Sequence, residues 1–164
     1  FINTTSQKLQ LHLSLAKQAE GDNSPTDFSN SYSRVDANWK INAFNLEAGI
    51  ETLGGDGKTA VQTPLATLHA FNGFADMFLN TPLNGLQDKW LGAGYLLHGH
   101  CQLAAQYHQY DGDKGSVNYG DEINFTFTHN FSKQLQLMGK VARYSADEFA
   151  KDTNKLWLGM SYAL

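Results

Sequence analysis

Hydrophobic and polar residues alternate along most of this chain, so that every second position carries an apolar side chain. At the C-terminal end, large apolar residues occupy every second position between Leu156 and Leu164. A period of two is the repeat of a β-strand with one apolar face. The alternation predicts strands over residues 8–19, 31–41, 44–53, 89–98, 101–110, 118–130, 134–145 and 156–164.

The connections between these segments alternate between short and long. Short turns are expected near residues 42–43, 99–100 and 132–133, and long polar connections at residues 21–30, 54–88, 111–117 and 146–155. Outer-membrane β-barrels have this asymmetry, with short periplasmic turns and longer extracellular loops. No helical pattern separates the strands, which argues against a parallel α/β sheet. We therefore predict an all-β fold: about eight strands of an antiparallel up-and-down transmembrane β-barrel, with short helical turns in the long extracellular loop 54–88.

The composition excludes a membrane-spanning helix but is compatible with a membrane β-barrel. Hydrophobic residues make up 41% of the chain, and no run approaches the ~18 consecutive apolar residues of a transmembrane helix. In a barrel only alternate residues face lipid, so a modest hydrophobic content suffices. The formal net charge of -4 does not favour a polyanion-binding surface, and nucleic acid is not an expected partner.

An apolar segment, TPLATLHAFNGFADMFLNTP, lies inside the longest loop at residues 63–82. Thr63 followed by Pro64 predicts the start of a helical turn. Because such a segment is unfavourable in water, we expect it to fold into the barrel mouth as a constriction or to cap the strand ends. The residues expected to form this constriction or cap are Pro64, Leu65, Leu68, His69, Phe71, Phe74 and Phe78.

Several stretches resemble the alginate export family of outer-membrane porins. They are LGGDG at 53–57, the apolar segment at 63–82, GLQD at 85–88, NYGDEIN at 118–124 and DTNKLWLGMSYAL at 152–164. The resemblance implies that residues 1–164 form the C-terminal part of a larger single-chain barrel in the bacterial outer membrane. A chain that starts at Phe1 without an initiator Met fits this expectation.

Charged residues on the polar face of the strands are the candidate site residues. In a porin, charged side chains that line the lumen set selectivity through the local field. The pore-lining candidates are Arg34, Asp36, Lys40, Glu47, Glu122 and Lys140. Alternatively, opposite charges pair across strands and only keep the wall hydrated. Acidic residues are at least as numerous as basic ones, so a general or different solute is favoured over polyanionic alginate.

The predicted function is an outer-membrane porin or channel for the passive passage of a polar solute, such as an oligosaccharide or polysaccharide. Neither a cofactor nor catalytic residues are predicted, since the chain contains no G-x-S-x-G motif. No metal site is predicted, because the histidines have no carboxylate or cysteine at a recognised metal spacing. Two alternatives stay open: a small eight-stranded outer-membrane enzyme or structural barrel, and a soluble ligand-binding β-barrel.

The expected partners follow from a location in the outer membrane. They are membrane lipid and lipopolysaccharide, the polar solute, and the barrel-assembly machinery, which would bind the C-terminal strand at residues 156–164. Aromatic residues near strand ends are expected to form interfacial belts. The members of these belts would be Trp39, Trp90, Trp157, Tyr95, Tyr107, Tyr119 and Tyr162.

Overall fold

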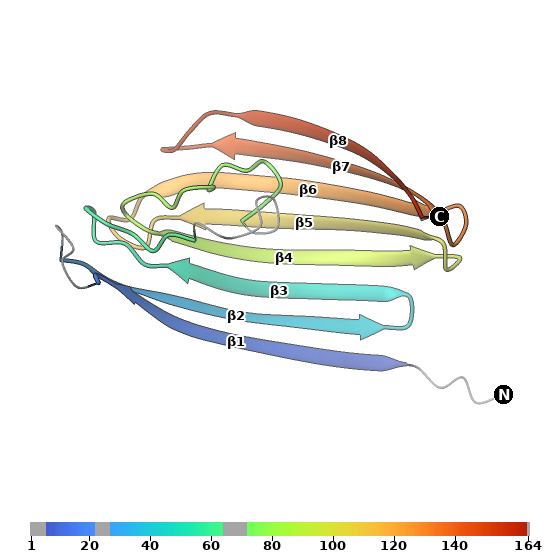
Figure 1. Cartoon of the computed structure of the whole chain (residues 1–164), viewed down its shortest axis with the longest axis horizontal. Helices are drawn as coiled ribbons and strands as arrows, with labels where there is room; N and C mark the ends of the chain where they lie inside the picture. Colours follow the sequence, from blue (N-terminus) through green and yellow to red (C-terminus); the bar gives the residue numbers. More distant parts are fainter. Residues whose placement is uncertain (1–5, 22–26, 64–71, 164) are drawn as a thin grey trace.

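The computed structural model (Figure 1) describes residues 6–21, 27–63 and 72–163, and these form one antiparallel β-sheet. Its eight strands pair in chain order, each with the next along the chain. They are β1 (Gln7–Ala19), β2 (Ser29–Ile41), β3 (Phe44–Leu53), β4 (Leu86–Leu97), β5 (Cys101–Asp111), β6 (Asn118–Asn130), β7 (Leu135–Ala146) and β8 (Thr153–Tyr162). The predicted all-β, antiparallel fold is confirmed. The described residues include no helix, and hence none long and apolar enough to cross a membrane.

The connections alternate in length as predicted, with short turns at one end of the sheet and long loops at the other. The turn at residues 42–43 places Asn42 at φ 54°, a left-handed conformation that Asn adopts more readily than most residues. Its side-chain oxygen accepts a hydrogen bond from the Ser6 amide at 3.1 Å. The helical turns expected from Pro64 onward fall partly on residues 64–71, outside the described residues, and residues 72–85 contain turns and bends but no helix.

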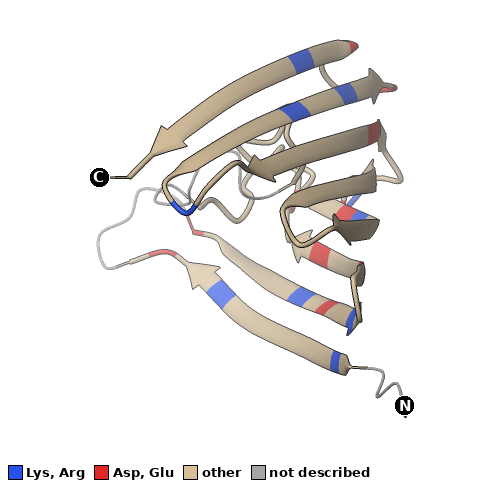
Figure 2. Ribbon diagram, turned by 90° about the vertical axis from the view of Figure 1, so that its right-hand side faces the viewer, with Lys and Arg blue, Asp and Glu red and all other residues tan. Residues whose placement is uncertain are grey.

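The sheet is curved and open. Figure 2 shows the strands along an arc, with the long loop on its concave side. Within the described residues, β1 pairs only with β2, and β8 pairs only with β7. The strands therefore form a wall with two free edges rather than a closed ring.

One face of the wall is apolar along all eight strands and exposed to the surroundings; we call it the outer face. Leu11 and Leu158, from opposite ends of the sheet, are 72% and 77% exposed. The large residues of this face are Leu9, Leu11, Leu13, Leu15, Val35, Trp39, Phe44, Leu46, Ile50, Leu91, Tyr95, Leu103, Tyr107, Ile123, Phe125, Phe127, Leu137, Val141, Leu156, Leu158, Met160 and Tyr162. Along β1 the apolar row runs from Leu9 to Leu15, about 20 Å at the rise of an extended strand. A soluble barrel would gather these rows in its interior, whereas here they are on the outside.

The expected aromatic belts are correct only in part. Trp39, Tyr95, Tyr107 and Tyr162 are on the outer face, and Tyr95 packs against Phe44 with ring centroids 4.7 Å apart. The other three expected members, Trp90, Trp157 and Tyr119, are not on the outer face. The pleat explains the two tryptophans, because each occupies the position before an outward-facing leucine in its strand.

The only extensive core within the described residues lies between the long loop and the other face of the sheet, which we call the inner face. Phe78 of the loop packs against Tyr110 of β5, Tyr119 of β6 and Phe149, with ring centroids 4.5, 5.9 and 5.3 Å apart. Tyr119 is drawn into this core by a register shift between β5 and β6. The shift requires the next residue to adopt φ 116°, which glycine does without strain, and that residue is Gly120.

Candidate functional site

Two glycines hollow out the inner face between β2 and β5. A Cβ atom at Gly49 would overlap the Trp90 ring, so the indole lies flat over the backbone of β3. A Cβ atom at Gly92 would lie 2.6 Å from Oε1 of Glu47, so the Glu47 side chain lies over β4 in the same way. Both side chains therefore extend along the wall, across strands where a Cβ atom is missing.

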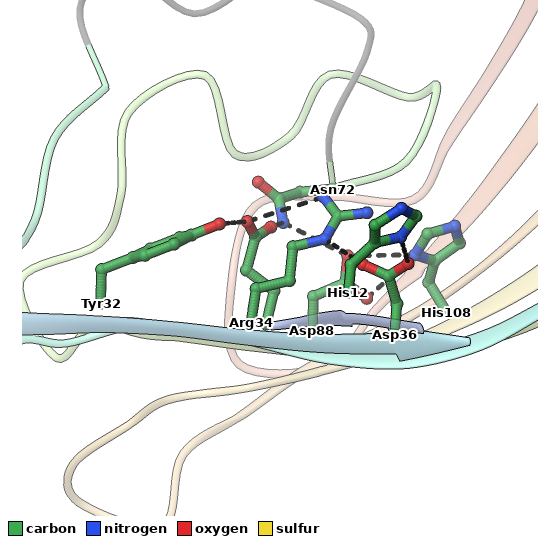
Figure 3. A network of polar contacts seen from close by, with 8 residues as sticks. His12, Tyr32, Arg34, Asp36, Asn72, Asp88 and His108 are labelled. Atoms are coloured by element: carbon green, nitrogen blue, oxygen red, sulfur yellow. Dashed lines mark hydrogen bonds and ion pairs between the residues drawn. The ribbon is translucent and has the colours of Figure 1, made fainter. Parts of the chain in front are cut away.

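A polar network spans the inner face of β1 to β5 (Figure 3). Asp36 of β2 accepts hydrogen bonds from Arg34 Nε at 2.7 Å and pairs with His12 Nδ1 at 2.8 Å. The Arg34 guanidinium also lies 3.9 Å from Glu51 and stacks over the Trp90 ring at 5.0 Å. The charge of Arg34 is thus compensated by two carboxylates.

The loop is fixed to this network at residue 72. The Asn72 amide donates to Glu51 Oε2 at 2.8 Å and to Asp88 Oδ2 at 3.3 Å. Glu51 also accepts a hydrogen bond from the Tyr32 hydroxyl at 2.6 Å, and Asp88 pairs with His108 Nδ1 at 2.9 Å. Carboxylates of β3 and β4 therefore hold the loop against the wall (Figure 3).

Further along, the loop crosses the wall to β8. The Ala75 amide donates to Oε1 of the fully buried Glu122 at 2.9 Å. Asp76 forms an ion pair with Lys155 of β8 at 2.9 Å. Because residues 72–76 are bonded to β3, β4, β6 and β8 in turn, they form a strap over the inner face; we use this name below.

Two hollows remain open beside the strap. The smaller has a volume of about 240 Å³, and the larger, nearer the short turns, about 400 Å³. Arg34, Glu47 and Trp90 line both hollows and divide one from the other. The wall therefore presents two adjoining hollows lined by charged, amide and aromatic groups.

Comparison with known proteins now defines the setting of this wall. Residues 3–148 match the sequence profile of a protein family described as Gram-negative porin. The chain belongs to the Gram-negative porin family. No curated protein and no solved structure matches it. The protein is an outer-membrane channel of a family that is typically non-enzymatic. In such a porin the apolar outer face contacts lipid and the polar inner face contacts water.

The inner face of the porin brings four of the six predicted pore-lining residues together. Arg34, Asp36, Lys40 and Glu47 all line the larger hollow.

The other two predicted pore-lining residues lie apart, at the strap. Lys140 of β7 stacks on Phe74 at 4.5 Å, and Glu122 of β6 is buried beneath Ala75 instead of lining the hollows. Phe78, the other described member of the predicted constriction or cap, lies in the aromatic core. The remaining members of that set, Pro64, Leu65, Leu68, His69 and Phe71, lie outside the described residues.

Charge is unevenly distributed over the porin's inner face. Around the two hollows stand the carboxylates of Asp36, Glu47, Glu51 and Asp88, with Arg34 and Lys40 as the basic residues. On the far side, β7 and β8 contribute Lys140 and Lys155. The wall of the hollows is therefore acidic, while β7 and β8 contribute two lysines, of which Lys155 is paired with Asp76.

Several important residues of this site were not predicted. Asp88 was assigned to the long loop because β4 was expected to begin at residue 89, whereas it begins at Leu86. Once that boundary is known, the alternation places both Asp88 and Trp90 on the inner face. The sequence contains no comparable indication for Asn72, because the position of a loop residue depends on tertiary contacts and not on strand alternation.

The long loop also contains a tight turn outside the strands. The backbone amides of Thr59 and Lys58 donate to Asp56 Oδ1 at 2.6 and 2.8 Å. These hydrogen bonds favour the ionised form and hold the pKa of the Asp56 carboxyl below its ordinary value. They order the first part of the loop, where Val61 N donates to the carbonyl of Gly54 at 2.9 Å.

Neither metal-binding clusters nor the outer face adds a polar site to the part of the porin that the structure describes. Among the described residues, no group of three or more His, Cys, Asp or Glu side chains is arranged to hold a metal ion. A hollow of about 530 Å³ lies on the outer face, where Ala93 and Ala105 are smaller than the surrounding Phe125 and Leu103. Its apolar lining suits lipid rather than a polar solute.

Proposed function

We propose that this porin lets polar solutes diffuse passively through a lumen bounded by its inner face, which the strap narrows. The observation that carries the proposal is the contrast between the two faces of one sheet. The outer face is apolar on every strand, whereas the inner face holds a hydrogen-bonded polar network and an inserted loop. The apolar face is compatible with lipid and the polar face with water. Passive diffusion through such a lumen needs neither an energy source nor a cofactor.

The same proposal includes closure of the sheet in the full-length protein. The free edges of β1 and β8 would expose backbone N–H and C=O groups. Such edges are unfavourable in lipid, where no water can satisfy them. We therefore take residues 1–164 as the C-terminal part of a larger barrel whose other strands complete the ring. The gene of the full-length protein tests this point directly, because it must encode further alternating strands.

The solute class follows from the side chains of the larger hollow. Beside its charged groups it presents the amides of Gln10, Asn38, Asn45 and Gln102. Amide side chains offer both donors and acceptors, which match the hydroxyl groups of a passing oligosaccharide. The acidic wall argues against polyanionic alginate, so the resemblance to the alginate export family stays a prediction about ancestry rather than solute.

The expected partners belong to the same proposal. Membrane lipid and lipopolysaccharide would contact the outer face. The barrel-assembly machinery would engage the C-terminal segment 156–164, where β8 presents Leu156, Leu158 and Met160 on the outer face.

Conductance of the full-length protein in a planar lipid bilayer tests the proposed function. We expect open channels in KCl, and Lys40→Glu should shift ion selectivity towards cations because Lys40 lines the larger hollow. Lys89→Glu is the matched control, since Lys89 pairs with Asp111 next to the outward-facing Leu91. A folded protein that never conducts would refute the proposal. Equal effects of the two substitutions would refute the assignment of the inner face.

A further inference from the structure

The smaller hollow on the inner face is acidic. Its lining includes the carboxylates of Glu47, Glu51 and Asp88, with Arg34 as its one permanently cationic side chain. Arg34 is already paired with Asp36 and Glu51 on β2 and β3. The net charge of the lining is therefore negative even with Arg34 in place.

Among the carboxylates of this hollow, Glu47 is the one that forms no ion pair with any residue that the structure describes. It accepts a hydrogen bond from Gln106 Nε2 at 2.6 Å. In contrast, Glu51 is bonded to Tyr32 and Asn72, and Asp88 is bonded to His108 and Asn72. Glu47 lines both hollows, so its side chain borders each of them.

Aromatic rings stand beside these carboxylates. Trp90 and Phe74 both line the smaller hollow. Both rings already take part in cation–π contacts, since Arg34 lies over the Trp90 ring at 5.0 Å and Lys140 over the Phe74 ring at 4.5 Å. Aromatic faces attract cations through the ring quadrupole, and ammonium groups are commonly recognised by rings combined with carboxylates. The volume of about 240 Å³ accommodates an ammonium or guanidinium group with a few carbon atoms.

We propose that the smaller hollow is a subsite for a positively charged organic group of a passing solute, with Glu47 as its ion-pair partner. The proposal rests on the proposed channel function and adds a solute chemistry to it. A neutral hydroxylated solute is the rival occupant, and it would bind chiefly by hydrogen bonds to the amides of the larger hollow. The two kinds of solute differ in charge, and the Glu47 carboxylate binds a cationic group more strongly than a neutral hydroxyl group.

Choline and its uncharged isostere dimethylbutanol are suitable probes, because they have the same shape and differ in charge. The full-length protein is placed in a planar bilayer in KCl, and the single-channel conductance is measured as each probe is added. Choline should lower the conductance in a saturable way, and dimethylbutanol should not. This comparison uses the unmodified protein and does not depend on the folding of any variant.

Substitutions then assign the effect to Glu47. Glu47→Gln should raise the half-effect concentration of choline about fivefold, as expected for the loss of one partly exposed ion pair. Glu47→Asp keeps the charge and should give a smaller increase. Asp111→Asn is the matched control, because it removes the same charge from the other side of the wall, and it should leave the choline effect unchanged.

The outcomes distinguish the subsite from the channel itself. A protein that conducts KCl but responds equally to choline and dimethylbutanol would refute the cationic subsite and favour a neutral solute. A choline effect that survives Glu47→Gln unchanged would refute the role of Glu47. Absence of any conductance would instead refute the proposed channel, and the subsite with it.

Discussion

The outer and inner faces of this sheet are built from the same strands but place different requirements on their side chains. On the outer face, residues such as Leu11 and Leu158 are exposed and need only to be apolar, because their environment is lipid throughout. On the inner face each position has a particular partner: Asp36 holds Arg34, and Glu122 holds the Ala75 amide. Outer positions should therefore respond to hydrophobicity, whereas inner positions should respond to shape and hydrogen bonding.

The largest expected effect comes from placing one charge on either face of the same strand. Ala105 of β5 lies between Ala93 and Phe125 on the outer face, and its neighbour Ala104 lies on the inner face. Ala105→Lys should lower the free energy of unfolding by about 2–4 kcal/mol, because it moves an ammonium into the hydrocarbon layer. Ala104→Lys should cost less than about 1 kcal/mol, since the ammonium stays in water. Reversible unfolding in lipid vesicles measures both values, and equal losses would contradict the assignment of the faces.

A somewhat smaller effect is expected where the strap is fixed to the inner face. Glu122→Ala leaves the Ala75 amide without an acceptor and should cost about 1–3 kcal/mol. Glu122→Gln retains the carbonyl oxygen that accepts this hydrogen bond and should cost less. Limited proteolysis of the strap in the folded protein reports on the local change, with the Ala variant cut faster than the Gln variant. Similar cleavage of both would show that the strap is held elsewhere.

Substitution of two inner-face glycines sharpens the distinction between shape and polarity. Gly49→Ala forces its new methyl group into the Trp90 ring and should destabilise the protein by about 1–3 kcal/mol. Gly94→Ala is the matched control on β4, because its nearest neighbour would lie at an ordinary 3.5 Å. The control should change the free energy of unfolding by less than about 0.5 kcal/mol. If Gly49→Ala were equally mild, the indole would not lie flat over β3 as described.

The smallest effect concerns the long loop, away from both faces. The depressed pKa of Asp56 means that its ionised form stabilises the folded loop. That contribution is complete above about pH 3.9, the ordinary value for an aspartate, and disappears as the pH falls through the lower pKa of the folded state. Asp56→Asn keeps a hydrogen-bond acceptor but cannot titrate. The rate of loop proteolysis should therefore rise on acidification in the wild type and much less in the variant, measured with an acid-active protease.

The fold could be read from the sequence to a large extent. The predicted boundaries of β3 and β6 agree with the structure, and the order of short and long connections is confirmed. This succeeded because lipid on one side and water on the other impose the period of two along each strand. Where the start of β4 was placed too late, Asp88 was lost from the predicted inner face. The expected belt position of Trp90 is wrong for a different reason: strand parity, not aromatic character, decides the face, and Trp90 lies opposite His108 on the inner face.

The candidate site was less predictable, because its geometry depends on contacts between distant segments. Alternation indicated that Glu47 and Glu122 share the inner face, but it contained no information on which of them the strap covers. The path of the strap decides this, and it is set by hydrogen bonds from Asn72 and Ala75 to carboxylates on different strands. The flat placement of Trp90 likewise depends on the absence of a side chain at Gly49, on the neighbouring strand.

The sequence by itself determined that this protein is an antiparallel sheet with one apolar and one polar face, because alternation is a local property that each strand carries. Only the tertiary structure decided which polar residues line the hollows and which are buried beneath the loop. Glu47 and Glu122 have the same side chain on the same face, yet Glu47 lines the hollows and Glu122 is fully enclosed. The physical reason is that burial and pairing of a carboxylate depend on the segments packed over it.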